Sequence, residues 1–141
     1  MGAYISTSDL NAEWGEGNVI LWSNLDNTDT SVDAARVTAA IAYAEGYVET
    51  RLRNLRYLVP FVFNSAGARA LFTRIMAVIA GEWLASHRAV VINEDLEATD
   101  LNQLPARRKW AENQIDMVSS SQMQPDLALG SDDVLAPFVV T

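Results

Sequence analysis

The fold is decided by residues 31–54, which read SVDAARVTAAIAYAEGYVETRLRN. Apolar side chains recur here at the three-and-four spacing of one helical face, at Val37, Ala40, Ile41, Ala44, Tyr47, Val48 and Leu52. Thr30 or Ser31 can cap the start of such a helix with a side-chain oxygen. We therefore expect a long amphipathic helix from Val32 to about Asn54.

Two features of this helix have more than one interpretation. Gly46 costs up to about 1 kcal/mol against Ala inside a helix, so it marks either close packing with a neighbour or a weak spot. Glu45 and Glu49 lie one turn apart, as paired catalytic carboxylates would. Arg53 follows Glu49 by four residues, which is typical of a solvated, ion-paired face, so we interpret the pair as a surface feature.

A second long helix follows an extended connection. Residues 55–63, LRYLVPFVF, mix aromatic and branched side chains around Pro60, which favours an extended segment over a continuing helix. Asn64 or Ser65 can then cap a helix. Its apolar positions repeat at helical spacing, at Ala68, Leu71, Phe72, Ile75, Ile79, Trp83 and Leu84. The two long helices are expected to form an antiparallel pair.

A third long helix and short N-terminal elements complete the pattern. Proline fits a first helical turn, so Pro105 predicts the start of a helix that carries Trp110, Ala111, Ile115 and Val118. Near the N-terminus, residues 6–9 can cap a short helix that Gly15 and Gly17 would end. Residues 19–22, VILW, are too few to assign, and a helical turn and a strand both remain open.

The chain after Ser119 loses helical periodicity. Residues 126–141 combine glycine, proline and acids with many apolar side chains, which predicts an extended arm. Such an arm should dock on protein, because segments that stay disordered are poor in these side chains. It packs either on its own domain or across another subunit. We therefore predict a mainly α fold, with a helical domain over 1–125 that has three long helices, and an extended C-terminal arm over 126–141.

Composition limits the classes of function. The formal charge of -8 is uneven: residues 1–30 and 119–141 carry acids and no Lys or Arg, whereas 31–118 carry ten of each sign. With a single lysine, Lys109, tight binding to DNA phosphates is not expected. The absence of cysteine excludes thiolate metal sites and cysteine nucleophiles. No signal peptide or apolar run of about 20 residues is present, so we expect neither secretion by that route nor a membrane span.

The sequence offers little catalytic chemistry. The only histidine, His87, lies at a helix end, where its ring can cap carbonyl groups. One histidine and no phosphate-cradling glycine loop disfavour hydrolase and nucleotide-binding functions. Residues 26–33, DNTDTSVD, resemble a calcium loop without its turn glycine and distal Glu, and an acidic loop that caps a helix is the preferred interpretation. We expect a non-enzymatic protein with no cofactor and no metal.

The interface candidates lie in two places. Arginines at the exit of the first long helix suit carboxylate partners, and the acidic flanks could supply these from a neighbouring copy in a head-to-tail ring. The candidates from this patch and from the apolar arm are Arg51, Arg53, Arg56, Tyr57, Leu127, Leu129, Val134, Leu135, Phe138, Val139 and Val140.

The order of motifs resembles a known family. Tyr4-Ile5 precedes Ser8-Asp9-Leu10, an Asp/Asn loop, a capped helix and then Arg56-Tyr57-Leu58-Val59-Pro60. An apolar helix from Ala68 to His87 and a late Trp110-Ala111 pair with Ile115 follow. Over roughly Tyr4 to Val118 this order resembles the small head-to-tail connector proteins of tailed bacteriophages; the arm lies outside the likeness.

The resemblance implies a head-completion or adaptor protein of the virion neck, present in the host cytoplasm during assembly. Copies would form a homo-oligomeric ring under the portal protein and present a surface to the next tail or neck component. DNA would pass through the channel without specific binding, and an acidic wall would let it slide. No catalytic residue comes with the family. The alternative is a small monomeric or dimeric helical binding or regulatory module.

Overall fold

A computed structural model describes residues 2–24, 30–53, 55, 57–87 and 98–129. Within these ranges the chain is mainly helical and contains no strand, which confirms the predicted fold class. The helices, in chain order, are α1 (Thr7–Trp14), α2 (Glu16–Ser23), α3 (Ala34–Leu52), α4 (Ala66–Ser86) and α6 (Ala98–Ser119). Three are long and two are short, as expected.

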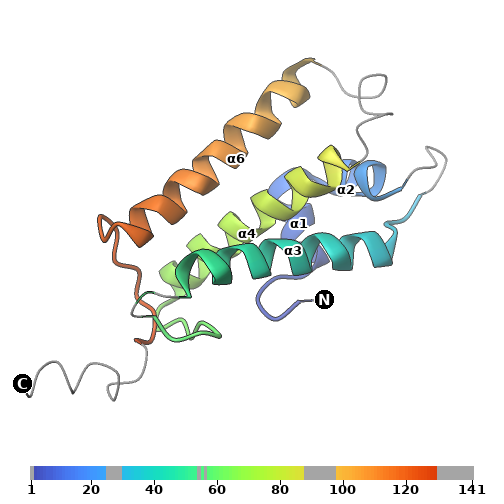
Figure 1. The fold of residues 1–141 in the computed structure, drawn as a ribbon. Coiled ribbons are helices and arrows are strands. Elements are labelled where there is room, and N and C mark those ends of the chain that lie inside the picture. The colour runs from blue at the N-terminus through green and yellow to red at the C-terminus, as the bar shows by residue number, and fades with distance from the viewer. Residues whose placement is uncertain (1, 25–29, 54, 56, 88–97, 130–141) are drawn as a thin grey trace, which may run out of the picture.

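The apolar helix α4 lies at the centre of the bundle. It contacts α1, α2, α3 and α6, and in Figure 1 it runs antiparallel to α3 on one side and to α6 on another. All side chains from Ile75 to Ala80 are buried, and so is Gly81. A helix that is covered on every side needs apolar residues all round, which explains why its sequence is richer in Ala, Ile and Val than that of a surface helix.

The two short helices pack on α4 and are separated by one glycine. Gly15 has φ 93°, a conformation that other L residues rarely adopt, so α1 can end and α2 can begin at adjacent positions. Residues 19–22, whose conformation the sequence leaves open, are helical and belong to α2. The Trp22 ring lies edge-on to Trp14 at 5.3 Å and is buried.

The start of α3 differs from the prediction. Helix α3 begins at Ala34, and Asp33, rather than Thr30 or Ser31, is the N-cap. The Asp33 carboxylate accepts the backbone N–H groups of Ala35 and Arg36 at 3.1 and 3.3 Å. A carboxylate both satisfies these donors and complements the helix dipole, so it is the stronger cap of those available.

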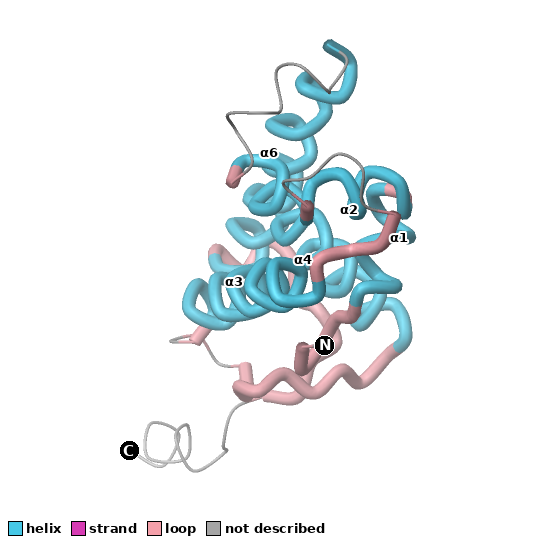
Figure 2. The backbone as a smooth tube through the Cα atoms, turned by 90° about the vertical axis from the view of Figure 1, so that its right-hand side faces the viewer, coloured by secondary structure: helices cyan, strands magenta, loops and turns pink. Residues whose placement is uncertain are grey.

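The segment between α3 and α4 is non-helical, as expected, and contacts the beginning of the arm. Tyr57 and Phe63 form antiparallel bridges to Leu129 and Leu127. Figure 1 shows the green and red-orange loop segments together at one end of the bundle, and Figure 2 shows loops gathered at that end. Ser65 caps α4 by accepting the N–H of Ala68 at 3.1 Å. Residues 130–141, the rest of the predicted arm, lie outside the described residues.

The predicted start of the third helix is wrong. Helix α6 begins at Ala98, and Pro105 lies inside it. Pro105 is exposed, so the backbone acceptor that it deprives of an N–H partner is on the solvated side of the helix. The neighbouring Leu104 is buried in the core cluster and holds this part of α6 on the bundle.

Candidate functional site

An apolar groove at one end of the bundle is the first candidate. It has a volume of about 600 Å³ and is lined by Ala3, Tyr4, Pro60 to Ala66, and Arg69. Aromatic rings form its base: Phe61 and Phe63 both pack against Phe72 of α4, at centroid distances of 5.4 and 5.6 Å. The Tyr4 ring packs on the same pair, at 5.6 and 6.1 Å.

The N-terminal wall of the groove is held by a buried carboxylate. Glu45 of α3 is 8% exposed, and its side chain accepts the backbone N–H groups of Ala3, Tyr4 and Ile5 at 3.0, 2.7 and 2.9 Å. The interpretation of Glu45 as a surface residue is therefore wrong. Backbone donors replace water around its charge, which is what a buried carboxylate requires. A side chain on Gly2 would collide with Glu45 and Ile41, so glycine permits this close approach.

Tyr4 connects three parts of the chain. Its hydroxyl donates to Glu49 of α3 and accepts the backbone N–H of Phe61 at 2.8 Å. Burial, together with the hydrogen bond to Glu49, raises the pKa of the Tyr4 phenol well above its ordinary value. Tyr4 therefore stays protonated and keeps the N-terminal segment and the Phe61 loop at fixed positions on either side of the groove.

Three exposed apolar side chains lie on the paired segments next to the groove. The N–H of Leu58 donates to the Ala128 carbonyl at 3.0 Å, and the N–H of Ala128 donates to the Val62 carbonyl at 2.8 Å. Leu58 is 39% exposed, Val62 49% and Leu129 50%. We call these three residues the apolar rim. Exposed apolar side chains that gather in one place are typical of a surface that binds another protein.

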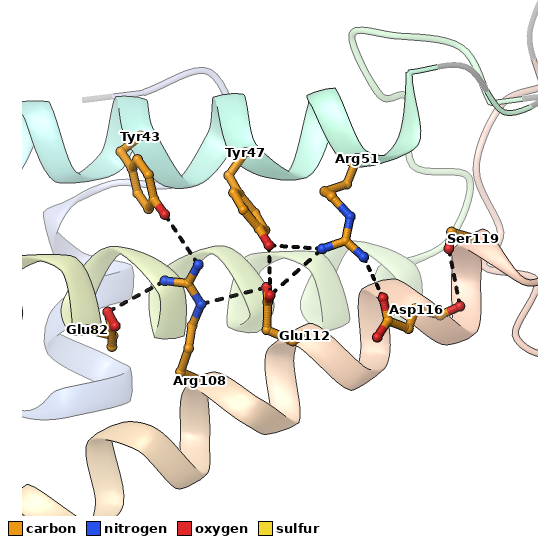
Figure 3. A network of polar contacts seen from close by, with 8 residues as sticks. All are labelled: Tyr43, Tyr47, Arg51, Glu82, Arg108, Glu112, Asp116 and Ser119. Atoms are coloured by element: carbon orange, nitrogen blue, oxygen red, sulfur yellow. Dashed lines mark hydrogen bonds and ion pairs between the residues drawn. The ribbon is translucent and has the colours of Figure 1, made fainter.

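A polar ladder along α3 and α6 is the second candidate. Tyr43, Tyr47 and Arg51 of α3 pair with residues of α6 that are each 65 positions later. Arg108 donates to the Tyr43 hydroxyl at 3.2 Å, the Tyr47 hydroxyl donates to Glu112 at 2.7 Å, and Arg51 forms an ion pair with Asp116. Figure 3 shows these rungs side by side, with α3 and α6 running in the same direction.

Arg108 is the most enclosed cation of the ladder. Its guanidinium lies 5.1 Å from the Tyr47 ring centroid and forms ion pairs with Glu82 at 3.5 Å and Glu112 at 3.6 Å. It therefore joins α3, α4 and α6. Burial and the Glu112 hydrogen bond raise the pKa of Tyr47, so this phenol is a hydrogen-bond donor at neutral pH. Chemically, the ladder stabilises the position of α6.

The predicted interface residues lie in different surroundings. Arg51 lies in the ladder, where its guanidinium is bound by acids of its own chain. Tyr57 and Leu127 are buried, Leu129 is exposed in the apolar rim, and Arg53 is exposed after the end of α3. The structure thus brings Tyr57, Leu127 and Leu129 together. Arg56, Val134, Leu135, Phe138, Val139 and Val140 lie outside the described residues.

Sequence reasoning missed the groove residues Tyr4, Val62 and Arg69. One signal was available, since Leu58 and Val62 are large apolar residues in a segment that proline keeps out of a helix. Tyr4 and Arg69 gave no local signal. They meet the groove only because α3 and α4 bring distant segments together.

The remaining predicted features are structural. His87 follows α4, where Nδ1 lies 2.8 Å from the Trp83 carbonyl oxygen and the two rings stack at 4.0 Å. Residues 26–29 of the acidic loop at 26–33 lie outside the described residues, and Asp33 at its end caps α3. In the part of the chain that the structure describes, no three acidic, histidine or cysteine side chains form a group that could hold a metal. Over that same part, no helix is long and apolar enough to cross a membrane.

No protein-family model matches the chain, and a search of curated proteins finds no significant match.

Proposed function

We propose that this chain is a structural, non-enzymatic adaptor of a tailed bacteriophage, which forms a ring under the portal and continues the DNA channel toward the tail. The observation that carries the proposal is the place of the Tyr57-Leu58-Val59-Pro60 motif. This motif supports the resemblance to connector proteins, and it lies beside the groove with Leu58 exposed in the apolar rim. A segment that only linked two helices would have no need of exposed leucine and valine side chains.

The ladder also supports a subunit with a mechanical role. Side chains of α3, α4 and α6 are joined through Arg108, so one residue links the three long helices. Cross-linked helices of this kind suit a subunit that must hold its shape in a ring. The excess of acids in the chain suits a channel wall, because it lowers the affinity for phosphate and lets DNA pass.

The second candidate function is a small binding module, monomeric or dimeric, without a ring. The burial of Leu127 favours it, because the first residues of the arm complete the core of their own domain. Under this function the apolar rim would bind a single partner protein. The two candidates differ in the mass of the assembly and in whether the portal is bound.

The deciding experiment is the mass of the purified chain, alone and mixed with the portal protein of the same phage, by native mass spectrometry. The adaptor function predicts a ring or a portal-bound complex. A Leu58→Ser/Val62→Ser variant should lose that complex, whereas Ala39→Ser, an exposed change on α3, should keep it. A chain that stays monomeric and does not bind the portal would contradict the adaptor function and leave the binding module.

A further inference from the structure

The groove combines an apolar base with one cation. Phe61, Phe63 and Pro60 supply apolar surface, and Arg69 on the first turns of α4 supplies the charge. Arg69 is exposed and has no ion pair among the described residues, unlike Arg74, which pairs with Glu13 at 3.2 Å. A ligand that satisfies this surface must therefore be apolar with an acidic group at one end.

The groove has a size that suits a short peptide. Its volume of about 600 Å³ lies within the range of about 300 to 1,000 Å³ that is usual for ligand pockets. It runs along the non-helical residues 60–64, and Val62 forms part of both the groove and the apolar rim. An extended peptide beside such a segment presents alternate side chains to the groove.

The chain itself contains a segment with the required pattern. Residues 131–140 read SDDVLAPFVV, so two acids come directly before a run that is almost wholly apolar. Asp132 and Asp133 complement Arg69, and the following Val, Leu, Phe and Val side chains complement the aromatic base. The segment spans up to about 33 Å when extended, which is more than enough to follow residues 60–64.

The direction of the described chain favours a second copy as the source of this segment. Leu127 lies beside Phe63, and Leu129 lies beside Tyr57. The chain therefore leaves the described region at the Tyr57 end and heads away from Ser65 and Arg69. To enter its own groove, it would have to reverse and pass the rim again.

We propose that the groove receives residues 131–140 of a second copy of this chain, with Asp132 and Asp133 against Arg69 and the apolar residues on Phe61 and Phe63. The inference rests on the proposed ring and names the contact that closes it: each copy donates its arm to one neighbour and accepts an arm from the other. Such a heterologous contact forms a ring when its rotation closes.

Disulfide trapping tests this contact on the full chain, which has no cysteine of its own. Three variants carry Val62→Cys together with Val134→Cys, Ala136→Cys or Phe138→Cys. Mild oxidation should give covalent dimers and larger species in at least one variant, about tenfold more than in the control Lys109→Cys/Ala136→Cys, because docking raises the local thiol concentration. Lys109 is exposed on α6 and does not line the groove.

Each other outcome overturns the proposal. If the oxidised variants contain only an intrachain disulfide, the arm occupies its own groove. If none of the three cross-links above the Lys109 control, the groove does not bind the arm.

A charge exchange tests the same contact without cysteine. Arg69→Glu in one preparation, and Asp132→Lys/Asp133→Lys in another, should each lower self-association at least about tenfold, since like charges then meet. Mixing the two should restore association, because each groove then finds an arm of opposite charge. If mixing does not restore association, but combining Arg69→Glu with Asp132→Lys and Asp133→Lys in one chain does, the arm lies in its own groove.

Portal binding, measured on the same samples, separates this inference from the proposed function. A chain that binds the portal but gives no trapped oligomer loses the arm contact and keeps the adaptor role. A chain that forms trapped oligomers and does not bind the portal keeps the arm contact and loses that role.

Discussion

The side-chain carboxylate of Glu45 accepts the backbone N–H of Tyr4 at 2.7 Å, across 41 positions of sequence. Two further N–H groups, from Ala3 and Ile5, share the same carboxylate. The donors that fix the N-terminal segment to α3 are backbone N–H groups, which almost any residue provides. Only the acceptor, Glu45, depends on the identity of a side chain.

Replacement of Glu45 by Ala should lower the free energy of unfolding by about 2 to 3 kcal/mol, because three backbone donors lose a charged acceptor in a buried site. Urea denaturation would measure the change. Glu49→Gln is the matched control one turn away: the amide oxygen can still accept from Tyr4, so the cost should stay below about 1 kcal/mol. Equal costs for the two variants would contradict a special role of Glu45.

Arg108 should contribute more to stability than Arg51, although both lie in the ladder. Side-chain exposure is 20% for Arg108 and 34% for Arg51, and the Asp116 partner of Arg51 is 62% exposed. We expect Arg108→Ala to cost about 2 kcal/mol and Arg51→Ala less than about 1 kcal/mol, since exposed ion pairs are weak. Thermal unfolding of the two variants under identical conditions compares them, and a larger loss for Arg51 would disprove the ranking.

The first residues of the arm should belong to the folding unit. Leu127 is 4% exposed and Leu129 is 50% exposed, two positions apart on the same segment. Leu127→Ala should cost about 2 to 4 kcal/mol through lost packing, whereas Leu129→Ala should cost less than about 0.5 kcal/mol. Chemical denaturation gives both values. Similar small costs would show that the segment does not pack on its own domain in solution.

Two glycines inside helices should respond in opposite ways to alanine. A Cβ at Gly46 meets open space, so Gly46→Ala should raise the free energy of unfolding by about 0.5 to 1 kcal/mol. A Cβ at Gly81 would collide with the Trp14 ring, whose Nε1 donates to the Ala77 carbonyl at 3.0 Å. Gly81→Ala should therefore destabilise the chain. A higher melting temperature for Gly46→Ala and a lower one for Gly81→Ala, each relative to the parent chain, would confirm both predictions.

Alkaline pH should weaken the fold through Tyr4. Its pKa is raised above the unfolded value of 10.0 by burial and by Glu49. As pH rises, the unfolded chain therefore releases the Tyr4 proton before the folded chain does. The contribution of Tyr4 to the free energy of unfolding is complete below the unfolded pKa and is lost as pH rises toward and through the folded pKa. Urea midpoints from about pH 8 to about pH 11 should fall, and Tyr4→Phe should fall less steeply. A parallel decline in both would assign the effect to other groups.

The helical fold could be predicted because its information is local. Apolar spacing located α3 and α4, and the glycine after Trp14 located the end of α1. The errors arose where competing local signals were weighed wrongly. Asp33, rather than the hydroxyl residues Thr30 and Ser31, caps α3. Pro105 lies inside α6 at an exposed position instead of at its start.

The site could not be predicted to the same extent because its contacts join distant segments. Glu45 and Glu49 look alike in sequence, and only the approach of residues 3–5 separates a buried acceptor from its half-buried neighbour. In the sequence, Gly46 and Gly81 are both glycines inside a predicted helix, and only the contact of Trp14 with Gly81 separates their roles. The sequence singled out Leu127 and Leu129 as apolar residues outside a helix, and Tyr57 by its place beside the arginines that follow the first long helix.

The three pairs between α3 and α6 share the same sequence offset of 65, so their spacing is the same on both helices. A shift of α6 by part of a turn leaves every rung out of line at once. A shift by a whole turn, about 5.4 Å, again brings a cation opposite a phenol and an acid opposite a cation: Arg108 faces Tyr47, and Glu112 faces Arg51. The polar pairs between α3 and α6 therefore favour positions of α6 that differ by whole helical turns over positions in between.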